Sequence, residues 1–240
     1  MPDHSPEIID GRGAAIERMF SAIAPRYDFL NRLLSAGRDR VWRRLAVTAT
    51  ALPREGSLLD ICTGTADMLL ESARQFPYAR FVGMDFSRPM ITLATAKIER
   101  ARLTDRVRLE VASAEALPVP DESFDAVSVA FGLRNLPDRL RGLREMHRVL
   151  RRGGRVVILE FTTPPGRAFR QVYLWYFHRV LPRIGRLVSG HPSAYSYLPS
   201  SVTDFPMPDG LVGWMREAGF HDVSYRLLTA GIVAIHVGVK

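Results

Sequence analysis

The sequence predicts an α/β protein built on a doubly wound, mostly parallel β-sheet. Between residues 57 and 161, five short apolar segments alternate with stretches of helical periodicity. Strands that are apolar on both faces are typical of a parallel sheet covered by helices on both sides. A length of 240 residues and a hydrophobic content of 47% suit one domain with a sizeable core. We therefore expect a single domain.

The strands and helices of this sheet are expected to alternate regularly. Strands are expected at 57–61, 80–86, 107–112, 124–131 and, after a turn at Gly153-Gly154, at 155–161. Helices are expected between them at 67–76, 88–101 and 140–150. These elements make up a cofactor-binding core over residues 53–161. Before the core, a helical cap over residues 1–52 is expected to contain helices at about 14–24, 27–36 and 39–51.

The carboxy-terminal part of the chain is less regular. An amphipathic helix is expected at 169–181, and repeated prolines then break the chain, so residues 162–208 are interpreted as a lid or insertion. The remaining residues, 209–240, are expected to form a helix at 209–218 and two strands at 223–229 and 232–240. The short connection between these strands, through Ala230-Gly231, predicts antiparallel pairing.

Composition excludes several classes of protein. The single cysteine, Cys62, rules out an internal disulfide framework and a Cys-rich zinc site, and no metal is expected. Residues 1–12 lack the basic start and apolar core of a signal peptide. The apolar stretch 227–239 is shorter than the about 20 residues that a membrane-spanning helix needs. We therefore expect a cytoplasmic protein.

The net charge of +8 is concentrated in one region. Residues 139–186 contain twelve arginines but only two acidic residues, Glu145 and Glu160. Such a region favours contact with nucleic acid, anionic lipid headgroups or a phosphorylated substrate. A solvated, arginine-rich face explains the same charge equally well, so the charge alone selects no partner.

Polar segments follow the carboxyl ends of four expected strands, where open parallel sheets bind their ligands. These segments are residues 60–67, 85–87, 112–115 and 131–135. Asp85 ends the second strand, 21 residues after Gly64. At this place a carboxylate can accept hydrogen bonds from both ribose hydroxyls of an adenosine. The spacing therefore predicts a nucleoside site.

The loop after the first strand favours S-adenosylmethionine over a dinucleotide. A dinucleotide site needs several glycines so that backbone amides can reach a pyrophosphate, whereas this loop contains only Gly64. Asp67 opens the next helix and disfavours a second anion at its amino end. S-adenosylmethionine carries an adenosine, no phosphate, and a positive sulfonium and ammonium, which suit Asp60 and Asp67.

Eight sequence blocks together carry a family resemblance that covers almost the whole chain. They are MFSAIAPRYDFLN (19–31), LLDICTGTADM (58–68), AEALPVPDESFD (114–125), FGLRNLPD (131–138), RVLRRGGRVVILEF (148–161), HRVLPRIGRLV (178–188), YSYLPSS (195–201) and LTAGIVAIHVG (228–238). In these blocks the sequence resembles the ubiquinone/menaquinone-biosynthesis C-methyltransferases. The resemblance implies a Rossmann-like, class I S-adenosylmethionine-dependent methyltransferase. It also implies methyl transfer to a ring carbon of a prenylated quinol, from demethylmenaquinol to menaquinol or at the corresponding benzoquinol step.

The resemblance also implies where the cofactor is bound. It places contacts at Thr65, at Asp85 and at Ser113-Ala114 beside the adenine. The site expected from the strand ends and the resemblance together comprises Asp60, Gly64, Thr65, Asp85, Phe86, Ser113 and Ala114.

Three positions of the chain depart from the family's usual pattern. Thr63 and Ala66 stand where glycine is usual, so we expect their side chains to hinder close approach of the methionine moiety. Ala130 stands where some members have serine, which removes one hydroxyl contact.

The catalytic candidates are Arg134 and Asn135, beyond the fourth strand, and Tyr27 and Asp28 in the cap. Arginine stays protonated, so Arg134 is expected to stabilise developing phenolate charge rather than to act as a base. Tyr27 and Asp28 are expected to close over the substrate, and Asp28 or His236 to accept the ring proton. A buried ion pair, a helix cap and core packing are the competing structural roles for these residues.

An aromatic and basic segment follows the core. It contains Phe169, Val172, Tyr173, Trp175, Tyr176 and Val180, together with Arg167, Arg170, Arg179, Arg183 and Arg186. Such a segment favours peripheral contact with anionic lipid at the inner face of the cytoplasmic membrane. Packing in the core or in a homodimer interface explains the aromatic stripe equally well.

Two other functions remain open at this point. The first is a methyltransferase for another small molecule or for RNA, although the sequence contains no appended RNA-binding module and we expect no nucleic-acid partner. The second is a non-catalytic binding or assembly protein whose altered loop, residues 63–66, no longer takes cofactor.

Overall fold

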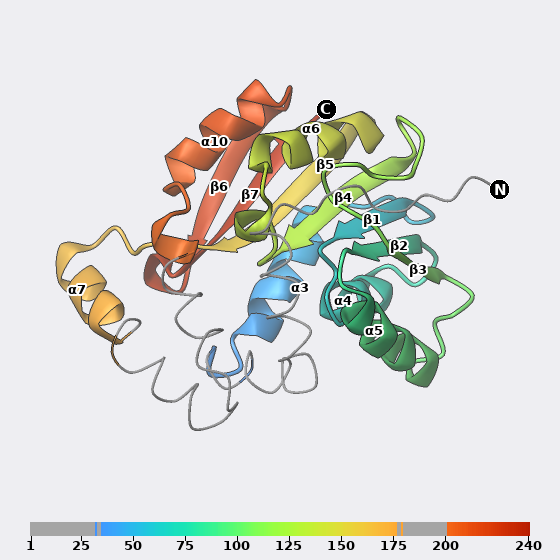
Figure 1. The fold of residues 1–240 in the computed structure, drawn as a ribbon, viewed down its shortest axis with the longest axis horizontal. Helices are drawn as coiled ribbons and strands as arrows, with labels where there is room; N and C mark the ends of the chain where they lie inside the picture. Colours follow the sequence, from blue (N-terminus) through green and yellow to red (C-terminus); the bar gives the residue numbers. More distant parts are fainter. Residues whose placement is uncertain (1–31, 33–34, 177–178, 180–200) are drawn as a thin grey trace.

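A computed structural model describes residue 32, residues 35–176, residue 179 and residues 201–240. Within these ranges the chain forms a seven-stranded sheet in the order β3-β2-β1-β4-β5-β7-β6 (Figure 1). The strands are β1 (Ser57–Ile61), β2 (Arg80–Asp85), β3 (Val107–Val111), β4 (Phe124–Ala130), β5 (Leu150–Phe161), β6 (His221–Leu228) and β7 (Val233–Val239). β1 to β5 pair in parallel, and β7 pairs antiparallel with both β5 and β6. The predicted parallel sheet with an antiparallel carboxy-terminal pair is confirmed.

Helices cover both faces of this sheet (Figure 1). The α-helices are α3 (Asp39–Ala49), α4 (Asp67–Gln75), α5 (Arg88–Arg100), α6 (Arg139–Val149), α7 (Arg167–Trp175) and α10 (Pro208–Glu217). In this view α6 and α10 lie above the sheet, and α3, α4 and α5 lie below it. Two short 3-10 helices, η2 (Leu133–Asn135) and η4 (Thr229–Gly231), follow β4 and β6.

The apolar spacing of the helices explains which face each of them buries. In α6, Leu143, Met146 and Val149 recur every three residues and are fully buried in the cluster shared with α10. Asp138 caps this helix by accepting a hydrogen bond from the Arg141 N–H at 2.9 Å. On the other face, Leu69 of α4 packs in a second buried cluster with residues of α5.

β5 begins five residues before the predicted strand. β5 starts at Leu150 and runs through the predicted turn, because the chain bulges there: Phe124 of β4 pairs with Leu150, whereas Ala126 pairs with Arg155. Gly153 takes φ +77° and donates its N–H to the Lys240 carbonyl at 2.7 Å. The glycines therefore bend a continuous strand instead of separating two elements.

Some predicted segments lie outside the described residues. The helix expected at 14–24, most of the one expected at 27–36, and the end of the one expected at 169–181 belong to these segments. The helix expected at 39–51 is confirmed as α3. Within the described ranges no helix is long and apolar enough to cross a membrane.

Candidate functional site

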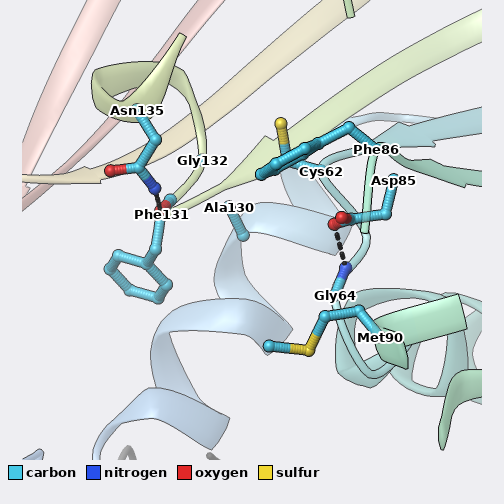
Figure 2. Close-up of a pocket in the computed structure, with 9 residues that line it drawn as sticks. All are labelled: Cys62, Gly64, Asp85, Phe86, Met90, Ala130, Phe131, Gly132 and Asn135. Atoms are coloured by element: carbon cyan, nitrogen blue, oxygen red, sulfur yellow. Dashed lines mark hydrogen bonds between the residues drawn. The ribbon is translucent and has the colours of Figure 1, made fainter. Parts of the chain in front are cut away.

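A pocket opens at the carboxyl ends of β1, β2 and β4 (Figure 2). Its empty volume, part of which is open to solvent, is about 400 Å³, and it is lined by Cys62, Gly64, Asp85, Phe86, Met90, Ala130, Phe131, Gly132 and Asn135. β1 and β4 are neighbours in the sheet, but the helices that follow them, α4 and α6, cover opposite faces. The pocket thus lies at the point where the order of the strands reverses, which is the usual ligand site of doubly wound sheets.

Asp85 joins the end of β2 to the loop that follows β1. Its Oδ2 accepts a hydrogen bond from the Gly64 N–H at 2.9 Å (Figure 2), and its Oδ1 accepts one from the Ser87 N–H at 2.9 Å. Burial raises the pKa of this carboxyl, and the two backbone hydrogen bonds oppose that shift. Because two carboxylate oxygens offer about four acceptor sites, Asp85 retains capacity for ribose hydroxyls.

Asp60 supports the loop that follows β1 through buried hydrogen bonds. It is 1% exposed, and its carboxylate accepts hydrogen bonds from the Thr63 hydroxyl at 2.7 Å and the Ser128 hydroxyl at 2.6 Å. Burial raises its pKa to about 6, despite these hydrogen bonds and the nearby Arg43. Asp60 does not line the pocket, so its position suits support of the loop.

Thr63 and Ala66, which we expected to hinder the cofactor, do not line the pocket. The Thr63 hydroxyl is bonded to Asp60, and the residue is 7% exposed. Ala66 is fully buried in front of α4 and takes φ +69°, a left-handed conformation that glycine adopts more easily. Thr63 and Ala66 therefore contribute to the packing and backbone conformation of the loop, and neither side chain contributes to the lining of the pocket.

Thr65 lies in the loop, but its hydroxyl is held by α5. Lys97 of α5 donates a hydrogen bond to the Thr65 Oγ1 at 2.9 Å and to the Asp67 Oδ1 at 2.7 Å. Thr65 is 3% exposed and does not line the pocket.

Ser113 and Ala114 follow β3 and also lie outside the lining of the pocket. Ala114 is buried in the cluster under α6, and Ser113 is exposed, with its Oγ accepting the Glu115 N–H at 3.2 Å. Their expected contact with the adenine stays a prediction.

The two site candidates in η2, Arg134 and Asn135, have different surroundings. Asn135 lines the pocket, and its amide donates a hydrogen bond to the Phe131 carbonyl at 3.4 Å (Figure 2). Arg134 is 5% exposed, and its Nη1 donates to the Phe131 carbonyl and, at 2.6 Å, to Glu160 at the end of β5. Burial raises the pKa of Glu160, and Arg134 opposes this shift. The structural alternative for Arg134, a buried ion pair, is therefore present.

His236 lies away from the pocket lining. On β7, its Nε2 is 3.1 Å from the Pro208 carbonyl, and its ring centroid is 5.3 Å from that of Tyr225. Burial lowers its pKa to about 4. This arrangement gives His236 a packing role between β7 and α10. The cap candidates Tyr27 and Asp28 lie outside the described residues.

The sequence predicted four of the lining residues and missed others. Gly64, Asp85, Phe86 and Asn135 were predicted as site residues and line the pocket. Cys62, Phe131 and Gly132 belong to the segments expected to carry the site but were not named as site residues, Ala130 at the end of β4 was considered only for the hydroxyl it lacks, and Met90 of α5 was not considered. Glu160 was also missed. An acidic side chain inside the apolar run RVVILEF was its signal, because a buried carboxylate needs a partner.

The pocket has the chemical groups that S-adenosylmethionine requires. Asp85 offers acceptors for ribose hydroxyls, and Phe86 and Met90 offer apolar surface for an adenine ring. Among the residues that the structure describes, no cluster of three metal ligands occurs. The lining therefore fits the nucleoside part of S-adenosylmethionine.

Comparisons with known sequences show the family of the chain. Residues 9–240 match the profile of the ubiE/COQ5 methyltransferase family. The ubiquinone/menaquinone biosynthesis C-methyltransferase UbiE of Geobacter sp. (strain M21) is 50% identical over 230 residues, which cover 95% of this chain and 97% of that protein. The demethylmenaquinone methyltransferase of Thermus thermophilus is 52% identical over 220 residues, covering 92% of this chain and 99% of that protein.

Solved structures show the same fold at low sequence identity. The [4+2]-cyclase SpnF superposes with a TM-score of 0.72 at 18% identity, covering 94% of this chain and 95% of that one. A SAM-dependent methyltransferase from Aquifex aeolicus superposes with a TM-score of 0.63 at 16% identity, covering 88% and 96%. These similarities concern the fold alone, because one fold serves different reactions.

Proposed function

Because the chain belongs to the ubiE/COQ5 methyltransferase family, we propose that it transfers a methyl group from S-adenosylmethionine to a ring carbon of a prenylated quinol of the demethylmenaquinol type. Relatives named for this chemistry are about half identical over nearly the full length of both chains. Neither RNA, another small molecule nor a non-catalytic role is favoured by these relatives.

The observation that carries the proposal is a single pocket that joins Asp85 and Gly64 on one side to Asn135 on the other. Asp85 and Gly64 suit the nucleoside, with Phe86 against the adenine. Asn135 is in position to orient a quinol oxygen. Bringing two reactants together in one pocket can supply about 7–11 kcal/mol of rate acceleration.

In this proposal the residues around the loop have supporting roles. S-adenosylmethionine supplies an electrophilic methyl group on a sulfonium. Asp60 fixes the loop through Thr63 and Ser128, and Thr65 fixes it through Lys97. Ser113 and Ala114 close the adenine end.

Arg134 and Asn135 act on the quinol. The ring carbon becomes nucleophilic as negative charge develops on the neighbouring oxygen, and the guanidinium of Arg134, which pairs with Glu160 behind the lining of the pocket, stabilises that charge at longer range. A guanidinium offers no acceptor for a proton, so the ring proton that leaves to restore aromaticity passes to water. Tyr27 and Asp28 close over the ring from the cap.

Product analysis tests the proposed reaction. The protein is incubated with S-adenosylmethionine and a chemically reduced demethylmenaquinone analogue, and the quinone fraction is analysed by fragmentation mass spectrometry. We expect a methyl group on the ring carbon with the reduced acceptor, and no product with the oxidised one, because only the quinol is electron-rich. If no methylated product forms with either acceptor although the protein binds S-adenosylmethionine, the proposed acceptor is refuted.

We further propose that α7 brings the site to an anionic membrane surface, from which a prenylated quinol can enter. Phe169, Val172 and Trp175 recur every three residues on α7 and are 41%, 62% and 61% exposed. Arginines precede and follow them in a region with few acidic residues. An exposed apolar stripe with neighbouring cationic side chains is typical of an interfacial helix.

Co-sedimentation with liposomes of anionic phospholipid tests the role of α7. We expect the protein to bind the liposomes at low salt and to bind them more weakly at high salt. Trp175→Asp is expected to weaken binding at both salt concentrations. Tyr78→Asp is the matched control, because Tyr78 is 58% exposed but lies at the start of β2, at the opposite end of the strands from the pocket. Equal binding by both variants would contradict this role.

The homodimer expected from the aromatic stripe stays a prediction. Light scattering after size-exclusion chromatography determines the mass of the particle in solution and tests it directly.

A further inference from the structure

Arg43 of α3 is a buried cation beside the pocket. The residue is 7% exposed, and its Cζ lies 5.3 Å from the ring centroid of Phe131, which lines the pocket. On its other side, its Nε is 3.9 Å from the Asp67 Oδ2. Arg43 therefore lies between the lining of the pocket and the start of α4.

The guanidinium of Arg43 has donors without acceptors. Its Nε and Nη1 are buried and have no hydrogen-bond partner in the part of the chain that the structure describes. The 3.9 Å separation from Asp67 is too long for a hydrogen bond. A buried charged donor without a partner is costly, so such a group indicates an acceptor supplied from outside the described residues, for which a bound ligand is a candidate.

The carboxylates nearest to Arg43 already accept other hydrogen bonds. Asp67 accepts one from Lys97 at 2.7 Å, and Asp60 accepts from two hydroxyls. Arg43 lowers the pKa of Asp60 through its charge, although burial outweighs this effect. The surroundings of Arg43 are thus charged, but they leave two of its N–H groups for a ligand.

The position of Arg43 is fixed by the neighbouring residue. Trp42 is 4% exposed and donates its indole N–H to the Thr229 hydroxyl at 2.8 Å, which ties α3 to the segment between β6 and β7. Its ring also packs against Phe131, with centroids 6.2 Å apart. The backbone that carries Arg43 is therefore held against the sheet before any ligand binds.

We propose that Arg43 binds the α-carboxylate of the methionine moiety of S-adenosylmethionine; this assignment rests on the proposed function. The carboxylate is the one anionic group of that molecule, and a guanidinium offers paired N–H donors that match it. Asp85 and Phe131 lie on opposite sides of the pocket (Figure 2). The ribose at Asp85 thus directs the amino-acid end toward Phe131 and Arg43.

Calorimetric titration with two probes tests the assignment. S-adenosylmethionine and its decarboxylated analogue share the adenosine, the sulfonium and the ammonium, and differ in the carboxylate. We expect the wild-type protein to bind S-adenosylmethionine about 10- to 100-fold more tightly, which is the range for a hydrogen-bonded charged pair. In Arg43→Met this ratio is expected to fall close to one, through loss of affinity for S-adenosylmethionine alone.

Two further variants separate carboxylate binding from general support of the loop. Lys97→Met removes the other cation that contacts Asp67, so it is expected to change both affinities by the same factor and to keep the ratio. Arg43→Lys keeps the charge but loses the paired donors, and an intermediate ratio is expected. If thermal unfolding shows that Arg43→Met is not folded, Arg43→Lys replaces it in the titration.

The outcomes distinguish this inference from the proposed function. If the wild-type protein binds neither probe, the proposed function fails and the inference fails with it. If the wild-type protein binds S-adenosylmethionine and the folded Arg43 variants keep the wild-type ratio, the assignment of Arg43 alone is overturned.

Discussion

At the scale of single residues, the burial of Asp60 makes the stability of the protein depend on pH. Burial raises its pKa from 3.8 to about 6 in the folded state. The contribution of this group to stability is therefore present below about pH 4 and is lost as the pH rises through about 6. Above this pH the ionised carboxylate accepts the hydrogen bonds from the Thr63 and Ser128 hydroxyls, which offset part of the cost of its burial.

We predict that Asp60→Asn becomes more stable relative to the wild type as the pH rises from about 4 to about 7. The change in this difference should approach about 3 kcal/mol, because one pKa unit corresponds to about 1.4 kcal/mol. Urea unfolding of both proteins at several pH values measures it. A difference in unfolding free energy that does not vary with pH would show that Asp60 is ionised normally.

Gly132 allows the loops after β1 and β4 to approach closely. A Cβ atom at this position would lie 2.4 Å from the Cβ of Cys62, and both residues line the pocket. We predict that Gly132→Ala lowers stability by about 1–3 kcal/mol, the usual cost of overpacking, and weakens binding of S-adenosylmethionine. Differential scanning calorimetry and titration measure the two effects.

Gly166→Ala is the matched control for Gly132. Gly166 takes φ −70° before α7, and a Cβ there would meet nothing within 4 Å. Its substitution should change stability by no more than about 0.5 kcal/mol. Equal losses in the two variants would mean that close packing against Cys62 is not the cause.

The polar lining residues Asp85 and Asn135 could be predicted from the sequence, whereas most of the apolar lining residues and the residues behind the lining could not. Asp85 and Asn135 follow strand ends, where a polar side chain is informative. Met90 is one of several apolar residues on α5, and nothing in the sequence distinguishes the one that reaches the pocket. Arg43 belongs to a helix with other arginines, so only its burial in the tertiary structure reveals it.

At the scale of elements, a buried ion pair fixes η2 to the end of β5. Arg134 and Glu160 lie 2.6 Å apart with side chains 6% and 1% exposed. We predict that Glu160→Gln lowers stability by about 3–5 kcal/mol, because it leaves a buried guanidinium without its counter-charge. Urea unfolding measures this loss.

An exposed ion pair provides the comparison. Arg144 and Glu217 join α6 to α10 at 3.5 Å, with side chains 59% and 57% exposed. Glu217→Gln should cost less than about 1 kcal/mol because solvent screens the pair. If Glu160→Gln is no more costly than Glu217→Gln, η2 is held by packing and not by its charge.

The order of elements was predictable because strands and helices differ in apolar period. β1 is buried along almost its whole length and is mostly apolar, and α6 buries every third residue. The early start of β5 was not predictable, because Gly153-Gly154 is a typical turn signal and only pairing with β4 and with Lys240 makes it a bulge. Local sequence identifies the glycines but not the partners that decide their geometry.

At the scale of the whole molecule, the order of the strands creates the site. β1 lies between β2 and β4, so the loops that carry Gly64, Asp85 and Asn135 meet, although these residues are far apart in sequence. A cyclase with the same fold shows that this arrangement does not determine the reaction. The chemistry therefore requires a direct test of the bond that is formed.

That test follows a methyl group labelled with carbon-13 from S-adenosylmethionine to a reduced demethylmenaquinone analogue. Nuclear magnetic resonance of the product identifies the atom that carries the label. We predict a labelled methyl bonded to a ring carbon, formed by the wild-type protein and strongly reduced in Asp85→Ala. A label on oxygen, or equal turnover by both proteins, would contradict the account of carbon methylation in this pocket.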